Sequence, residues 1–131
     1  MKTQLWMPAI TLYQPWASFV VHLLKPLETR GHSRFACLQG QHVAIHAAAK
    51  FDADWMDAIA VVFGYDDADK AQRVLNFCRE MEDNGGFPRQ AVLGIAYVDD
   101  ARWMQDDRLA HSALCCTAGR FGLFLKDIER L

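Results

Sequence analysis

The chain has 131 residues, a length that fits one domain, and we expect residues 1–131 to form a single unit. Hydrophobic residues make up 52% of the sequence, and no apolar run approaches the roughly 18 residues that predict a membrane span, so we expect no membrane partner. The net charge of −2 argues against a general nucleic-acid binder. The N-terminal residues do not have the pattern of a signal peptide, which predicts a cytoplasmic location by default.

The charges are unevenly distributed along the chain. Residues 1–50 contain five basic side chains and one acidic side chain, residues 51–107 contain five and thirteen, and residues 108–131 contain four and two. If the first and last segments lie together in the fold, they form a basic surface that can accept a phosphate backbone on an otherwise acidic protein. A solvated mixture of charges is the alternative interpretation.

Residues 9–13 form an apolar run that predicts a strand, and Pro15 suits the first position of a helix because it has no N–H to lose. Apolar residues then recur at helical spacing to about Leu24, at Trp16, Phe19, Val20 and Leu23. This pattern leaves Gln14 and Ser18 beside a helix N-terminus, where backbone N–H groups can hold an anionic or hydrogen-bonding ligand. A packing corner without a ligand is the alternative.

The segment after this helix is predicted to be extended. Pro26 disfavours the helical conformation for Lys25, so residues 25–30 read as a strand. Side chains two residues apart point to the same face of a strand, and Glu28 and Arg30 can therefore form an ion pair. Together with Lys25 they make a charged cluster.

Residues 31–40 are predicted to form a loop, because the segment is polar and has glycines at both ends. Its notable side chains are His32, Arg34 and Phe35. The loop is long for a simple connection, which favours a binding role. Residues 41–46 then predict a strand with His46 on one face, and such a histidine is more often a hydrogen-bonded core or rim residue than a catalytic one.

The middle of the chain is predicted to be helical. Asp52 can cap one helix that reaches about residue 63, and Asp67 or Asp69 can begin a second helix. The sequence Asn-Gly-Gly at residues 84–86 is a strong stop for the second helix.

Two strands are predicted in the C-terminal third, at residues 90–98 and 121–125. Gly94 inside the first of them indicates a bulge or the close approach of another backbone. Asp99 and Asp100 mark the predicted end of that strand and the start of a loop. Strands at both ends of the chain with helices between them predict an α+β domain in which non-adjacent strands close a small barrel.

The cysteines do not form an even disulfide framework and are expected to be reduced; they are Cys37, Cys78, Cys115 and Cys116. A zinc site would have to draw on these thiols together with His32, His42 and His46. No CxxC knuckle supports such a site, and His42 and His46 lie in a predicted strand, so we expect no metal and no cofactor.

Five segments occur in an order that matches a known family, namely residues 12–18 (LYQPWAS), 25–30 (KPLETR), 43–47 (VAIHA) with Lys50, 92–94 (VLG), and 119–121 (GRF) with Leu125. Together they resemble the ASCH domain, a relative of the PUA-like barrels, over most of the chain. Two features differ from the family pattern. Leu24 stands where a glycine usually precedes the lysine, and the loop at residues 31–40 lacks the family's tryptophan and proline.

The resemblance implies a small PUA-like β-barrel with flanking helices, and a partner that is RNA, another nucleic acid or a nucleotide. It implies ligand-binding roles for Gln14, Trp16, Ser18, Lys25, Glu28 and Arg30, with His46, Lys50 and Arg120 as further candidates. In this interpretation the basic side chains hold a phosphate or a base edge, and Trp16 stacks on a base or packs in the core. Glu28 accepts a hydrogen bond from a base or orients Arg30.

Some relatives of this family are amidohydrolases that act on acylated cytidine with a lysine, a threonine three residues later and a distant glutamate. Lys25 stands at the lysine position, but Glu28 replaces the threonine and is a poor substitute for a hydroxyl nucleophile. The alternative to a binding module is therefore a small hydrolase acting on RNA or a modified nucleoside, with Lys25 stabilising charge and Glu28 as general base. That role requires a Glu28 carboxylate without a tight ion pair. A protein-interaction domain is a third possibility.

Overall fold

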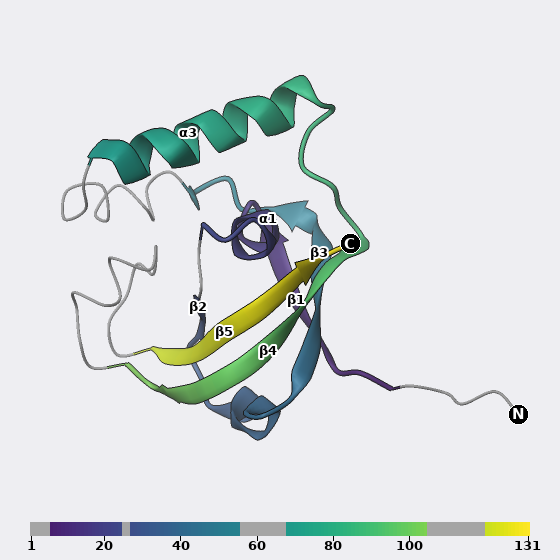
Figure 1. Ribbon diagram of the computed structural model, residues 1–131, viewed down its shortest axis with the longest axis vertical. Helices are drawn as coiled ribbons and strands as arrows, with labels where there is room; N and C mark the ends of the chain where they lie inside the picture. The colour runs from purple at the N-terminus through teal and green to yellow at the C-terminus, as the bar shows by residue number, and fades with distance from the viewer. Residues whose placement is uncertain (1–5, 25–26, 56–67, 105–119) are drawn as a thin grey trace, which may run out of the picture.

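The computed structural model describes residues 6–24, 27–55, 68–104 and 120–131. The described chain is a small α+β domain in which a curled five-stranded mixed sheet forms a half-barrel, with helices packed against it (Figure 1). In chain order the elements are β1 (Ala9–Gln14), α1 (Trp16–Val21), β2 (Leu27–Arg30), the 3-10 helix η1 (Arg34–Leu38), β3 (His42–Phe51), α3 (Ala68–Asp83), β4 (Ala91–Trp103) and β5 (Phe121–Arg130). The predicted α+β class is confirmed.

The strand order in the sheet is β1-β3-β4-β5-β2. β1 pairs with β3 in parallel, and the other neighbours are antiparallel. Non-adjacent strands pair as predicted, β1 with β3 and β2 with β5, but the sheet forms a half-barrel where the sequence predicted a small closed barrel. The pairing of β2 with β5 brings part of the first basic segment beside part of the last one. β1 and β2 are the two edges of the sheet.

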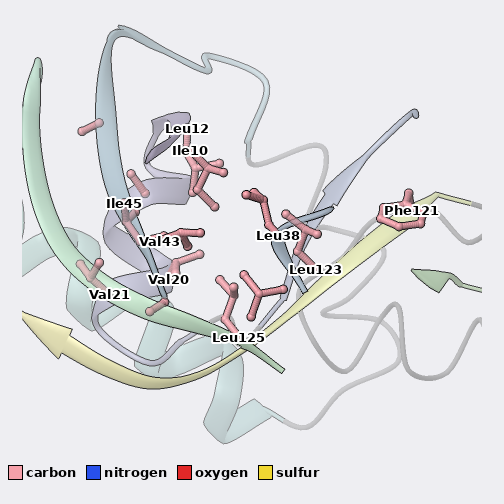
Figure 2. Close-up of a cluster of buried hydrophobic side chains, with 14 residues drawn as sticks. Ile10, Leu12, Val20, Val21, Leu38, Val43, Ile45, Phe121, Leu123 and Leu125 are labelled. Atoms are coloured by element: carbon pink, nitrogen blue, oxygen red, sulfur yellow. The ribbon is translucent and has the colours of Figure 1, made fainter. Parts of the chain in front are cut away.

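The core lies on the concave side of the sheet (Figure 2). Burial alternates along β1, where Ile10 and Leu12 point inward and their neighbours Ala9 and Thr11 are exposed. This is the pattern of a strand with one buried face. α1 adds Val20 and other apolar side chains to the same cluster. Each large aliphatic side chain that is fully buried contributes roughly 1.5–3 kcal/mol, so this cluster holds α1 against the sheet.

α1 ends at Val21, before the predicted end at Leu24. Leu23 adopts the left-handed conformation with a φ of 64°, and the backbone N–H of Leu24 donates to the carbonyl of Phe19 at 2.9 Å. This is the Schellman arrangement that ends many helices, here formed without glycine. The chain therefore turns into β2 after a short helix. Lys25 and Pro26 lie outside the described residues.

α3 covers α1 on the side away from the sheet (Figure 1). Val74 and Phe77 of α3 pack with Phe19 in a second, smaller apolar cluster. The helix ends as predicted at the glycine pair, where the N–H of Gly86 donates to the carbonyl of Met81 at 2.8 Å. No helix among the described residues is long and apolar enough to cross a membrane.

The helix predicted after Asp52 falls mostly outside the described residues. The carboxylate of Asp52 does accept the backbone N–H of Asp54 at 3.0 Å, as a helix-capping side chain would. Residues 31–40, predicted as a loop, contain the single turn of η1, whose Leu38 is buried in the core cluster. η1 lies at the end of the half-barrel away from α3 (Figure 1).

The predicted end of the strand at Asp99 and Asp100 is wrong, because β4 continues to Trp103 alongside β5. The two carboxylates are tolerated there because both are solvent-exposed or half-buried and paired, Asp99 with Lys126 and Asp100 with Arg102, each at 3.1 Å. The close approach predicted at Gly94 is confirmed. A Cβ at this position would lie 2.7 Å from the carbonyl oxygen of Glu129 in the neighbouring strand.

Candidate functional site

The candidate ligand-binding residues separate into three places in the fold. Three of them occupy the start of α1, and two lie on the outer face of β1 and β3. Glu28, Arg30 and Arg120 meet where β2 runs beside β5. Lys25 lies outside the described residues. The structure thus brings together only part of the set that the sequence suggested.

We call the start of α1 the Gln14 corner, formed by Gln14, Trp16 and Ser18. The side chain of Gln14 is 0% exposed, and both ends of its amide are used inside the protein. Its Nε2 donates to the carbonyl of Pro88 at 2.6 Å, and its Oε1 accepts the backbone N–H of Ser18 at 3.0 Å. Gln14 therefore fastens the segment that follows α3 to the first turn of α1.

The other two residues of the Gln14 corner also face the protein. Ser18 is 0% exposed, and its hydroxyl oxygen has no hydrogen-bond partner among the described residues. The indole N–H of Trp16 donates to the Asp52 carboxylate at 2.9 Å, and its ring packs edge-on against Phe19 with centroids 5.8 Å apart. Of the two roles considered for Trp16, the packing role matches this geometry.

His46 and Lys50 lie on the outer face of β1 and β3. The Nδ1 atom of His46 is 3.2 Å from the hydroxyl of Thr11, its parallel-strand neighbour. The ammonium group of Lys50 lies 5.1 Å from the centre of the Tyr13 ring, a cation–π contact on an exposed surface. His46 is thus a hydrogen-bonded rim residue. Within the described part of the chain, neither side chain makes a hydrogen bond or ring contact with the side chain of Arg30 or Arg120.

Glu28 and Arg30 form the ion pair that their spacing predicts. An oxygen of the Glu28 carboxylate is 3.3 Å from Nη2 of Arg30, and the two side chains are 10% and 26% exposed. The other Glu28 oxygen accepts the backbone N–H of Thr29 at 3.0 Å. Arg30 also donates from Nη2 to the carbonyl of Thr11 at 2.8 Å, so its guanidinium group bridges the two edge strands, β2 and β1.

Arg120 lies immediately before β5 and is held against β2. Its Nη2 donates to the carbonyl of Thr29 at 3.4 Å, and the next residue, Phe121, is the register partner of Arg30. The Nε atoms of Arg30 and Arg120 are both buried without an acceptor among the described residues. A buried donor left unpaired costs about 1–3 kcal/mol, and the described residues satisfy these two guanidinium groups only in part.

We call Arg30, His32, Arg34 and Arg120 the arginine cluster; two of its members, Arg30 and His32, contact the ring of Phe35. The Arg30 guanidinium carbon is 5.4 Å from the centre of that ring, and the His32 ring centre is 5.5 Å from it. The backbone N–H of Arg34 donates to Nδ1 of His32 at 3.2 Å. The neutral imidazole then carries its proton on Nε2, where it can act as a donor.

The arginines of the cluster act on the pKa of His32. Partial burial lowers the pKa of His32 from 6.5, and the positive charges of Arg34, Arg30 and Arg120 lower it further. A histidine in such surroundings is mostly neutral at pH 7. Among the described residues, Glu28 is the one carboxylate paired with any of the three arginines. The cluster therefore carries an excess of positive charge.

His32, Arg34 and Phe35 were not among the candidate residues from the sequence. The signal that pointed to them was the long loop between Gly31 and Gly40. Their proximity to Arg120 depends on the pairing of β2 with β5, which joins positions far apart in the chain. Local sequence patterns do not report such a contact.

The arrangement fits an anion better than a metal ion. Guanidinium groups present planar sets of donors that match the oxygens of phosphate or carboxylate. No group of three histidine, cysteine, aspartate or glutamate side chains suited to a metal occurs among the residues that the structure describes. Within the same residues Cys37 and Cys78 are free thiols.

Comparison of the chain with protein-family models and with curated proteins gives no match.

Proposed function

We propose that this protein binds RNA or a nucleotide through the arginine cluster and has no chemistry of its own. The observation that carries the proposal is the gathering of three guanidinium groups and a histidine at one place, with Glu28 as their one paired carboxylate among the described residues. Arginine is the residue best suited to phosphate, because its fork of donors binds two oxygens at once.

The surroundings of the arginine cluster support the same ligand class. Arg34 is exposed, and Arg30 retains 26% of its side-chain exposure. The acidic residues of the chain are concentrated between positions 51 and 107. A polyanion is therefore attracted to one part of the surface and repelled from the rest, which favours a short or local contact over wrapping of a long duplex.

We further propose that the fold is an ASCH-like relative of the PUA barrels. The half-barrel, the pairing of β1 with β3, and the close packing at Gly94 support this assignment. On this assignment Lys25, three residues before Glu28 in the sequence, is a further basic candidate for contact with the ligand.

The hydrolase alternative has less support. It needs a Glu28 carboxylate that is available as a general base. Glu28 is largely buried, lies 3.3 Å from the Arg30 guanidinium, and accepts the N–H of Thr29. Both carboxylate oxygens of Glu28 are therefore engaged within the protein and are not directed at a substrate. We therefore do not assign a catalytic role to Glu28.

The test is a salt titration of single-stranded RNA binding, followed by fluorescence anisotropy from about 50 to 200 mM salt. Arg34→Ala removes an exposed guanidinium without touching the hydrogen bonds of β2. We expect it to weaken binding about tenfold at low salt and to reduce the slope of the salt dependence by about one.

The matched control is Arg79→Ala, which removes the same charge from an exposed position on α3. It should leave both affinity and slope unchanged. Binding that is indifferent to salt, or equal losses in the two variants, would refute the proposal, since either result means that the arginine cluster does not contact phosphate.

A further inference from the structure

We propose that the arginine cluster receives a terminal phosphate monoester of its ligand, at the end of an RNA strand or on a mononucleotide, in preference to an internal phosphodiester. This inference rests on the proposed function, because it specifies which part of a nucleotide the cluster holds. Its basis is the match between the charge and donors that the cluster presents and those that each kind of phosphate can use.

The first consideration is charge. Arg30, Arg34 and Arg120 carry three positive charges, and the Glu28 carboxylate offsets one of them through Arg30. Two positive charges remain in a compact place. A phosphate monoester carries a charge of about −1.5 to −2 at pH 7, whereas an internal diester carries one negative charge. The monoester is therefore the better match to the excess charge.

The second consideration is the number of donors. The exposed guanidinium of Arg34 has no acceptor among the described residues, and Arg30 keeps part of its side chain exposed. His32 adds a neutral N–H on Nε2, since its Nδ1 is occupied by the backbone N–H of Arg34. Three terminal oxygens of a monoester can use more of these donors than the two unbridged oxygens of a diester.

The third consideration is that the cluster is held in place before a ligand arrives. Arg30 is anchored to the carbonyl of Thr11, and Arg120 to the carbonyl of Thr29. Phe35 lies beneath both Arg30 and His32, and it is itself packed against the core cluster. Groups that are ordered by the protein lose little freedom on binding, which favours a small, strongly charged ligand group.

The experiment uses one short single-stranded RNA sequence in three forms, with a 5′-phosphate, with a 3′-phosphate, or with hydroxyl groups at both ends. A nucleoside monophosphate and the corresponding nucleoside are tested beside them by thermal shift. We expect one phosphorylated RNA to bind about tenfold more tightly than the hydroxyl form at equal salt. The monophosphate should raise the melting temperature and the nucleoside should not.

The variants assign the effect to the arginine cluster. Arg34→Ala should remove most of the preference for the phosphorylated end, and Arg79→Ala should preserve it. Equal affinity for all three RNA forms, with Arg34→Ala weakening each of them, would overturn the inference and leave the proposed function standing, because binding would then use internal phosphates. If no RNA form binds and the monophosphate does not stabilise the protein, the proposed function itself fails.

Discussion

The Gln14 corner and the arginine cluster are both polar, and both contain residues that the sequence suggested as ligand contacts, yet they use their hydrogen-bonding groups differently. In the Gln14 corner, the side-chain N–H of Gln14 donates to the carbonyl of Pro88, and its side-chain oxygen accepts the backbone N–H of Ser18. In the arginine cluster, the exposed guanidinium of Arg34 has no acceptor among the described residues, and Arg30 is still 26% exposed. Buried polar groups that pair with each other hold a fold together, whereas exposed donors without a protein acceptor are available to a ligand.

The two regions also lie differently in the molecule. The corner is covered by α3 and the segment that follows it, whereas the cluster adjoins η1, at the end of the half-barrel away from α3 (Figure 1). A change in the corner should therefore act on stability, and a change in the cluster should act mainly on binding.

The largest effect is expected for Gln14→Ala. The substitution leaves the carbonyl of Pro88 and the N–H of Ser18 without the amide that pairs with them, and it opens a small cavity in a fully buried place. We expect a loss of about 2–4 kcal/mol in the free energy of unfolding, measured by urea denaturation.

The affinity of the folded fraction for RNA should be unchanged in Gln14→Ala. Gln39→Ala is the control, because Gln39 is exposed and its side chain makes no hydrogen bond in the described part of the chain. It should shift stability by less than about 0.5 kcal/mol. A Gln14→Ala protein of normal stability and weaker RNA binding would mean that the corner is a ligand site after all.

Arg30→Ala should affect both properties, because Arg30 belongs to the cluster and also bridges β1 and β2. Its loss removes the bond to the carbonyl of Thr11 and one partner of the largely buried Glu28 carboxylate. We expect about 1–3 kcal/mol less stability, short of the full cost of breaking a deeply buried pair because Arg30 is partly exposed, and at least tenfold weaker RNA binding.

Arg102→Ala is the matched control for this change. Arg102 pairs with Asp100 at 3.1 Å, with both side chains nearly half exposed. An exposed pair of this kind contributes about 0–1 kcal/mol, and its loss should not alter RNA binding. Equal effects of the two substitutions on affinity would show that only the overall charge matters and not the cluster.

Much of the fold follows from local sequence patterns, and the exceptions have physical causes. The β1 strand, the glycine stop after α3 and the tight contact at Gly94 were predictable, because each depends on the residues of one segment. The continuation of β4 through Asp99 was not, because an acidic pair usually marks a turn. Here Lys126 of the adjacent strand pairs with Asp99, and that partner is visible only once β4 and β5 are aligned.

The same limit applies to the candidate site. The sequence correctly indicates a helix start beside Gln14, but it does not show that Pro88, from the segment after α3, covers it. In the arginine cluster, one contact was predictable from the sequence and another was not. The ion pair of Glu28 and Arg30 was predictable from their spacing alone. The position of Arg120 beside them depends on the antiparallel pairing of β2 with β5, which lie far apart in the sequence.

Trp16→Phe separates packing from stacking. Phenylalanine keeps most of the apolar contact with Phe19 but cannot donate to Asp52. We expect a loss of about 1–2 kcal/mol in the free energy of unfolding, because the lost bond is to a charged acceptor, and no change in RNA affinity. Trp103→Phe, at an indole that is 47% exposed, should change stability by less than about 0.5 kcal/mol. A Trp16→Phe variant with normal stability and reduced affinity would instead place a base on this ring.

The smallest effect concerns two histidines, His22 outside both regions and His32 in the arginine cluster. His22 lies at the end of α1, where burial and then the charge of Arg130 lower its pKa from 6.5. Its Nδ1 is 2.6 Å from Nη1 of Arg130, and its ring contacts Phe77. Because the pKa is lower in the folded chain, the unfolded chain binds more protons below about pH 6.5, and stability falls as the pH decreases through that region.

His22→Gln should therefore make the loss of stability between about pH 7.5 and 5.5 shallower, by about 0.5 kcal/mol or less because solvent screens a half-exposed group. His32→Gln should act in the same direction in the free protein, since Arg34, Arg30 and Arg120 also lower the pKa of His32. A bound nucleoside monophosphate offsets those three charges and so should remove the effect of His32→Gln, while the effect of His22→Gln persists. If the monophosphate left both histidine effects intact, its phosphate would not lie beside His32, and the assignment of the arginine cluster as the anion site would have to be abandoned.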